Sequence, residues 1–178
     1  DGYLQRRATS SLPMEGQRTF DSTAVEVDMS SDTTIYMSFA LSLNGGSNNM
    51  TALVGLLDST TGDTVLAGVE GGNWAIRGAA GDLTGASVAR NQTTFVVVKI
   101  EANNLSDDFI YIKTYDSAND LVHQNDTLLS GTGNGADQWN LISTTGNANG
   151  IFDHLFISAG AYGSSLGTND VTIDEIRI

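Results

Sequence analysis

Alternating apolar and polar residues run through the chain and predict strands rather than helices. The clearest example is residues 33–43, where Ile, Met, Phe and two Leu alternate with small residues and one Tyr. A period of two places the apolar side chains on one face of a strand and the polar side chains on the other. Similar runs recur between clusters of Gly, Asn, Asp and Ser, which is typical of a sandwich or barrel.

We expect an all-β fold, an antiparallel sandwich of two packed sheets with about nine to twelve strands. Strands are predicted over residues 24–29, 33–43, 51–57, 64–70, 73–77, 93–101, 108–115, 138–143, 151–158 and 171–178. Residues 93–101 are apolar almost throughout, which indicates a strand in the middle of a sheet, covered on both faces. Residues 78–92 are predicted to be a glycine-rich connection, and residues 116–137 a largely polar loop.

The length of 178 residues fits a single domain over 1–178 with a large buried core. Residues 1–24 are expected to form an irregular N-terminal arm, within which 3–7 could be an edge strand. Three of the six arginines, Arg6, Arg7 and Arg18, lie in this arm. We expect them to pair with carboxylates of the same chain, and the alternative is a contact with another molecule.

The acidic balance of the chain limits its partners. The formal net charge is −13, so nucleic acid and anionic membranes are disfavoured, whereas divalent cations and neutral sugars are compatible. No apolar run approaches the roughly 20 residues of a membrane span, so membrane insertion is not expected. Cysteine is absent, which does not exclude secretion, and the chain opens on Asp1, which suits a processed mature protein or an excised domain.

The last predicted strand, residues 171–178, resembles the closing strand of concanavalin-like lectin and glucanase domains, a jelly-roll group that includes laminin-G-like modules of secreted bacterial proteins. Further similarity lies in residues 35–39, 96–100 and 152–155, and in Asp108 three positions before Tyr111. The resemblance implies the jelly-roll fold and an extracellular location. The resemblance says less about function, because proteins with this fold include lectins, hydrolases, lyases and adhesive modules.

A metal site is expected at Asp174. Alternation places Asp174 on the same face as Ile176 and Ile178, where an unpaired carboxylate would be costly. The resemblance implies that an Asp at this position helps to hold a structural Ca²⁺, with backbone carbonyls near Gly16 or Gly45 completing the shell. The alternative is a buried Asp that accepts hydrogen bonds from backbone N–H groups.

A sugar site is expected around the two tryptophans. Sugar recognition needs an aromatic surface for the C–H faces of the ring and planar polar groups for its hydroxyls. Each tryptophan has such neighbours in sequence, although each could instead be a core or lid residue. The candidate ligand-binding residues are Asn73, Trp74, Arg77, Trp139, Asn140 and Tyr162.

Catalysis is not expected. Glycosidases of the resembled group carry Glu-x-Asp-x-x-Glu on one strand, but here Glu26 and Asp28 are followed by Ser31 where the second Glu would stand. His154 lies between Phe152 and Phe156 on a predicted strand, where a lone histidine is more often packed and hydrogen-bonded than catalytic.

The first hypothesis is therefore a secreted, non-catalytic domain that binds a polysaccharide or glycan, with a structural Ca²⁺. The alternative is a structural or adhesive subunit that associates with copies of itself in an extracellular fibre or matrix. A glycoside hydrolase or polysaccharide lyase with an unrecognised site is the third hypothesis.

Overall fold

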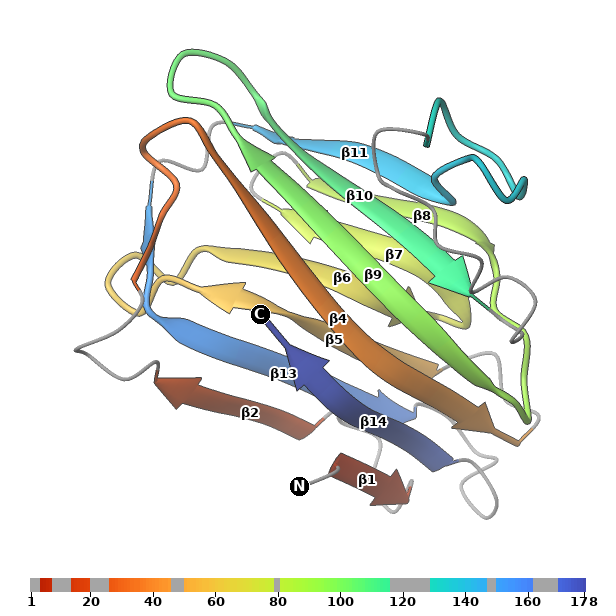
Figure 1. Cartoon of the computed structure of the whole chain (residues 1–178). Coiled ribbons are helices and arrows are strands. Elements are labelled where there is room, and N and C mark those ends of the chain that lie inside the picture. The colour runs from red at the N-terminus through yellow and green to blue at the C-terminus, as the bar shows by residue number, and fades with distance from the viewer. Residues whose placement is uncertain are drawn as a thin grey trace.

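The computed structural model describes residues 4–7, 14–19, 26–45, 50–78, 81–115, 129–146, 150–161 and 170–178, which form a two-layered antiparallel β-sandwich (Figure 1). Sheet A has the strand order β1-β14-β4-β9-β10-β11, and sheet B has the order β2-β13-β5-β6-β7-β8. Strands β3 and β12 pair in a separate two-stranded ribbon. The predicted all-β sandwich of two packed sheets is confirmed.

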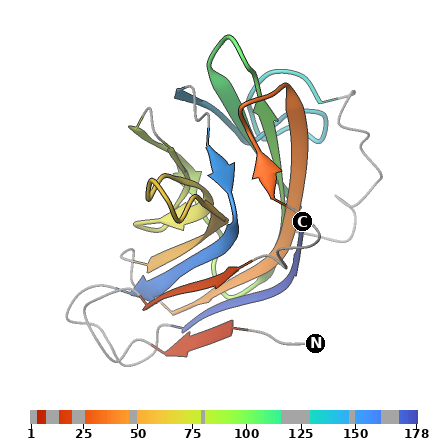
Figure 2. The same ribbon diagram turned by 90° about the vertical axis from the view of Figure 1, so that its left-hand side faces the viewer.

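Sheet A consists of β1 (Leu4–Arg7), β4 (Thr33–Asn44), β9 (Thr93–Ala102), β10 (Asp108–Tyr115), β11 (Leu141–Gly146) and β14 (Asp170–Arg177). Sheet B consists of β2 (Met14–Thr19), β5 (Met50–Leu57), β6 (Thr64–Glu70), β7 (Asn73–Gly78), β8 (Gly81–Ser87) and β13 (His154–Ala161). The ribbon is β3 (Val27–Asp28) with β12 (Ile151–Phe152). Figure 2 shows sheet A curving around sheet B.

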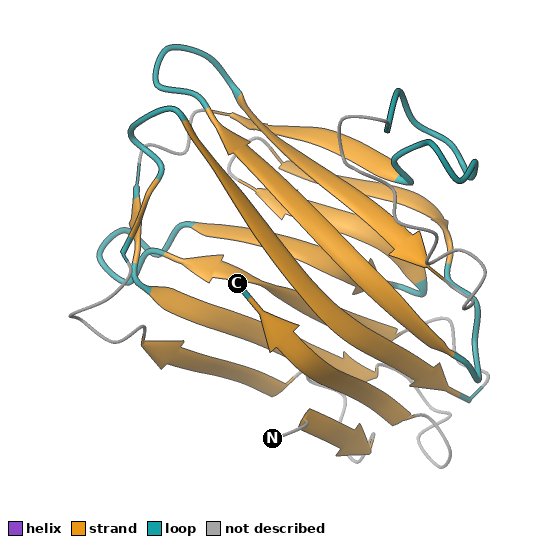
Figure 3. Cartoon of the chain, in the orientation of Figure 1, coloured by secondary structure: helices purple, strands orange, loops and turns teal. Residues whose placement is uncertain are grey.

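The described part of the chain consists of strands and the loops between them (Figure 3). Within these residues, no helix has the length and hydropathy that a membrane crossing would need.

The core lies between the inner faces of the two sheets. Sheet A contributes alternate residues of its central strands, and sheet B contributes the facing alternate residues of its own. Fully buried core residues are Met37, Phe39 and Leu41 of β4, Val96, Val98 and Ile100 of β9, Ile110 and Ile112 of β10, Val54 and Leu56 of β5, and Ile76 of β7. Burying one large apolar side chain stabilises a fold by about 1.5–3 kcal/mol, so this alternation is the main determinant of the sandwich.

Several sequence expectations need correction. β8 lies within the segment predicted as a connection, and β2 lies within the segment predicted as an irregular arm. β9 is buried on its inner face, but its outer face is only half-buried, because sheet A has no third layer over it among the described residues. The strand predicted over 151–158 is interrupted at Asp153, which separates β12 from β13.

The closing strand contains a bulge that changes the position predicted for Asp174. Glu175 has a φ of 54°, and the pairing of β14 with β4 shifts register between Asp174 and Arg177. A bulge adds a residue to one strand and reverses the alternation beyond it. Ile176 therefore packs against the core, while Asp174 pairs with Ala40 and faces outward. The expectation that Asp174 shares a face with Ile176 is wrong.

Phe39 provides a test of the core. Its side chain is 0% exposed, so Phe39→Ala would leave a cavity between the sheets. We expect a loss of about 3–5 kcal/mol in the free energy of unfolding, measured by urea denaturation. The exposed Thr34 on the same strand is the control, and Thr34→Ala should change stability by no more than about 0.5 kcal/mol. Equal effects of the two substitutions would contradict this assignment of the inner face.

Candidate functional site

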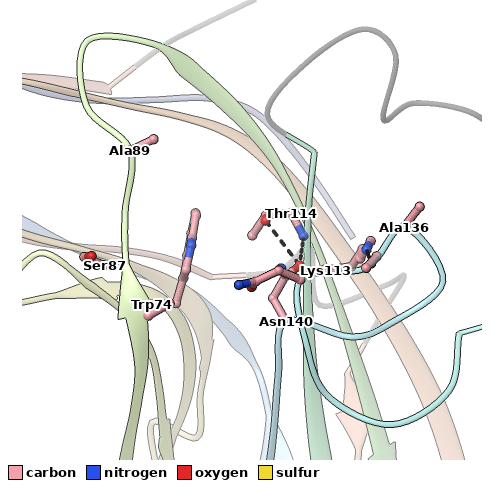
Figure 4. Close-up of a pocket in the computed structure, with 10 residues that line it drawn as sticks. Trp74, Ser87, Ala89, Lys113, Thr114, Ala136 and Asn140 are labelled. Carbon is pink, nitrogen blue, oxygen red and sulfur yellow. Dashed lines mark hydrogen bonds between the residues drawn. The ribbon is translucent and has the colours of Figure 1, made fainter.

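A pocket of about 260 Å³ opens between the two sheets, at the edge where β7 and β8 approach β10 and the segment 134–140. It is lined by Trp74, Ala86, Ser87, Ala89, Lys113, Thr114, Asn134, Gly135, Ala136 and Asn140. Figure 4 shows Trp74 on one side of this pocket and Asn140 with Thr114 on the other. We call this the edge pocket.

Trp74 forms the apolar wall of the edge pocket. Alternation along β7 turns its side chain inward between the sheets, where it is 7% exposed and belongs to the core cluster. A largely buried indole is rigid, because neighbouring core side chains hold its position. The part of the Trp74 indole that lines the pocket is therefore a fixed aromatic surface.

Asn140 provides a planar polar group whose orientation is fixed. Its Oδ1 accepts hydrogen bonds from the backbone N–H of Thr114 at 2.7 Å and from the Thr114 hydroxyl at 3.2 Å. Its own backbone N–H donates to the carbonyl of Ile112 at 2.8 Å. These bonds extend the pairing with β10 to Asn140, the residue just before β11. Because Oδ1 faces Thr114, the side-chain amide nitrogen of Asn140 points away from Thr114.

Lys113 holds the loop that closes the pocket. Its side chain is 4% exposed, and Nζ donates to the carbonyls of Gly135 and Gln138, both at 2.8 Å. An ammonium group is costly to bury unless hydrogen bonds replace its hydration. The loop therefore stays against β10. Lys113 is therefore buried although it lies on the outer face of sheet A.

Glycine makes this loop geometry accessible. A Cβ at Gly133 would lie 2.2 Å from Oε1 of Gln138, and a Cβ at Gly135 would lie 2.9 Å from the same atom. The backbone N–H of Gly135 donates to that oxygen at 3.1 Å. The loop is therefore closed by Gln138 and Lys113 together.

Trp139 does not line the edge pocket. It is 4% exposed, and its ring packs against Tyr111, with centroids 5.1 Å apart, on the outer face of sheet A. Its backbone pairs within the loop, with its N–H donating to the carbonyl of Gly131 at 3.2 Å. The two candidate tryptophans thus lie in different surroundings, and Trp74 alone of the two contributes to the pocket.

Asn73 and Arg77 lie on the opposite face of β7 from Trp74, because their positions differ from it by odd numbers of residues. On the outer face of sheet B, Arg77 binds Glu70 through both Nε, at 2.8 Å from Oε2, and a second nitrogen. Its Nε is also 3.6 Å from Oδ2 of Asp82. The grouping of Trp74 with Asn73 and Arg77 in one site is therefore wrong. Tyr162 lies outside the described residues.

Asp174 has a local hydrogen bond at the bulge. Its Oδ1 accepts from the backbone N–H of Glu175 at 2.8 Å. Over the part of the chain that the structure describes, no group of three or more acidic or histidine side chains converges as a metal site would require. The Ca²⁺ at Asp174 stays a prediction.

His154 begins β13, with Nδ1 2.8 Å from Oδ1 of Asp153 and a side chain that is 13% exposed. Asp153 accepts hydrogen bonds from the hydroxyl of Ser59 at 2.5 Å and from its backbone N–H at 2.9 Å. The Ser59 hydroxyl, followed by His154, holds the pKa of Asp153 well below its usual value. This arrangement joins the β5–β6 turn to the junction of β12 and β13.

A second polar group, which the sequence analysis missed, lies on the outer face of sheet A. The Tyr111 hydroxyl donates to Oε2 of Glu101 at 2.6 Å, and Nζ of Lys99 lies 2.7 Å from Oε1 of the same carboxylate. Lys99 Nζ also lies 5.4 Å from the centroid of the Tyr111 ring. Burial, together with the hydrogen bond to Glu101 and its negative charge, raises the pKa of Tyr111 to about 12. We call these three residues the Lys99–Glu101–Tyr111 network.

The chain matches no family model and no curated protein. Among solved structures, it is similar to a sialidase, with a TM-score of 0.55 and 9% identity over 98% of this chain. It is also similar to the alginate lyase AlgAT5 from polysaccharide lyase family 7, with a TM-score of 0.53 and 12% identity over 98% of this chain. The binding domain of botulinum neurotoxin DC, solved with rat synaptotagmin II, gives a TM-score of 0.54 and 13% identity over 98% of this chain.

These similarities establish the fold. The chain spans 15% of the sialidase, 76% of the alginate lyase and 38% of the neurotoxin chain. At such low identities the shared property is the concanavalin-like jelly roll, as the sequence resemblance implied. The fold of this chain is therefore a concanavalin-like β-sandwich.

The titration of Tyr111 tests the network. We expect Tyr111 to ionise near pH 12 rather than at the ordinary pKa of 10.0, when followed by the NMR shift of its ring Cζ. The folded-state pKa lies above the unfolded value. The contribution of Tyr111 to stability is therefore complete below about pH 10 and is lost between about pH 10 and 12.

Glu101→Gln should lower the Tyr111 pKa part of the way toward 10.0, because burial is the largest cause of its increase. Ionisation of Tyr111 near the ordinary tyrosine pKa of 10.0 would contradict the network.

Proposed function

We propose that this chain is a non-catalytic carbohydrate-binding domain that holds a sugar unit of a glycan or polysaccharide in the edge pocket. The observation that carries the proposal is the pairing of a rigid indole wall with an oriented amide across one pocket, as Trp74 and Asn140 provide. Sugars need this combination, because their rings present both apolar C–H faces and hydroxyl groups.

The size and lining of the pocket support a small polar ligand. Its volume of about 260 Å³ lies just below the ~300–1,000 Å³ typical of pockets for drug-sized ligands, so it suits one or two sugar units. Thr114, Ser87 and Asn134 add further polar groups to the lining. With a net charge of −13, the chain favours a neutral ligand over a polyanion.

The structural neighbours support a polysaccharide ligand, although they do not favour a neutral one. An alginate lyase and an endo-β-1,4-glucuronan lyase from the fungus Trichoderma reesei share the fold, with TM-scores of 0.53 and 0.51. Their names state that they act on polysaccharides. A polysaccharide lyase is therefore the second candidate function. Unsaturated products after incubation with a polysaccharide would favour a lyase over a protein that only binds.

Filling the pocket tests the proposal. Ala89 is exposed and lines the pocket, so Ala89→Trp should occupy part of it without disturbing the core. We expect at least tenfold weaker binding of neutral polysaccharides, measured by affinity gel electrophoresis on glucan, xylan and galactomannan.

Thr60→Trp is the matched control, because Thr60 is exposed in the β5–β6 turn, at the opposite end of β6 from Trp74. It should leave binding unchanged. Equal affinity of both variants and the wild type for every polysaccharide that binds would refute the edge pocket as the site.

A structural Ca²⁺ at Asp174 is part of the proposal and has its own test. A ligand that binds only the native state raises the unfolding midpoint. We expect Ca²⁺ to raise the midpoint and EDTA to lower it in the wild type, and Asp174→Asn to abolish both effects. An identical unfolding midpoint in Ca²⁺ and in EDTA would refute the Ca²⁺ site. Light scattering on the same samples tests the alternative of self-association.

A further inference from the structure

We infer that the outer face of sheet A carries a second contact site for the same glycan chain, centred on Tyr36 and the Lys99–Glu101–Tyr111 network. This inference rests on the proposed function, because the second site acts on a chain that is already held in the edge pocket. The occupant to which it commits is a neutral polysaccharide.

Strand register brings these side chains together from three neighbouring strands. Tyr36 of β4 pairs with Lys99 of β9, and Lys99 pairs with Tyr111 of β10. All three lie on the outer face, because the alternate residues of the same strands form the core. Figure 1 shows these strands side by side in the front sheet.

Glu101 lies one row further along the same face, and its carboxylate connects β9 to β10. Tyr111 donates to one of its oxygens at 2.6 Å, and Lys99 approaches the other at 2.7 Å. The ring of Tyr111 is supported in turn by Trp139. The polar groups are therefore fixed before a ligand arrives, which lowers the entropic cost of binding.

The site is accessible to a ligand. Tyr36 is 45% exposed, and the Glu101 side chain is 33% exposed. Glu101 also lines an open hollow of about 640 Å³, together with Asp32, Thr34 and Asn103. An exposed aromatic face beside fixed hydrogen-bonding groups and an open polar hollow is the arrangement that a sugar ring requires.

The network holds a lysine, a glutamate and a tyrosine in one geometry, with the side chains of Lys99 and Glu101 15% and 33% exposed. The charges of Lys99 and Glu101 cancel, so the site offers hydrogen bonds rather than a net field. Next to Tyr36 on β4, the outer positions are the small Ser38 and Ala40, which leave room for a chain along the sheet.

The two sites are close enough for one polysaccharide chain to reach both. Tyr111 of the network and Thr114 of the edge pocket lie three residues apart on β10, which is about 10 Å along a strand, but their side chains are on opposite faces of sheet A. A chain that contacts both must therefore pass around the edge of the sheet, so it must be several sugar units long. A mono- or disaccharide in the pocket would not extend to Tyr36, whereas a long chain would. Two linked contacts raise the apparent affinity for the long chain.

Dependence on ligand length gives the experiment. Binding of neutral glucan, xylan and galactomannan, and of the disaccharide of each, is measured by calorimetry on the wild type, Tyr36→Ala, Glu101→Gln and Ile151→Ala. Ile151 is the matched control, because it is 48% exposed, similar to Tyr36, but lies in the separate ribbon of β3 and β12. Unfolding midpoints verify that each variant is folded.

We expect Tyr36→Ala and Glu101→Gln each to weaken binding of the long chain at least tenfold and to leave disaccharide binding unchanged, with no effect of Ile151→Ala. Unchanged long-chain binding in both variants would overturn the second site, while Ala89→Trp would still weaken binding through the pocket. If Ala89→Trp has no effect on any ligand, the edge pocket fails, and this inference fails with it.

Discussion

Sheets A and B bury their apolar inner faces against each other, and this packing fixes where every other side chain points. In a strand with a period of two, burying one set of residues turns the intervening set outward. On β10, the burial of Ile110 and Ile112 places Tyr111 and Lys113 on the outer face. On β7, the inward position of Trp74 places Arg77 on the outside of sheet B. The candidate sites are thus consequences of how the core is packed.

The edge pocket depends on a second constraint, the buried ammonium of Lys113. Its charge would be costly in the interior without carbonyl partners, and the loop provides those of Gly135 and Gln138. The same loop supplies one wall of the pocket and presents Asn140 at the start of β11. A polar group that would otherwise destabilise the strand therefore holds the pocket-lining loop in place. Trp74, on the opposite wall, is held by the core itself.

Much of the fold could be predicted from the sequence, because β4 and β10 alternate strongly and end at clear turn residues. β8 was missed, since its run of Gly, Ala, Ser and Thr has little apolar alternation. The opposite orientation of Arg77 and Trp74 follows from their odd separation along β7, so it could be predicted from the sequence.

The contacts of Lys113 and Glu101 were harder to foresee. The carbonyls that Lys113 binds are more than 20 residues away in sequence, and no local pattern indicates such a contact. The proximity of Tyr111 to Glu101 follows from the register of the β9–β10 hairpin, which the turn at 103–107 allows but does not specify. The bulge at Glu175, with its positive φ, likewise depends on tertiary pairing, and it changed the expected position of Asp174.

The most direct test of the edge pocket is to map where a sugar binds by NMR chemical-shift perturbation. The probes are the disaccharides of glucan, xylan and galactomannan, titrated into the labelled protein. The pocket predicts that the Trp74 indole N–H and the Asn140 side-chain amide shift most, in saturable fashion. Perturbations concentrated instead at Arg77, Phe156 and His154, on the outer face of sheet B, would contradict the account and place the site on the other side of that sheet.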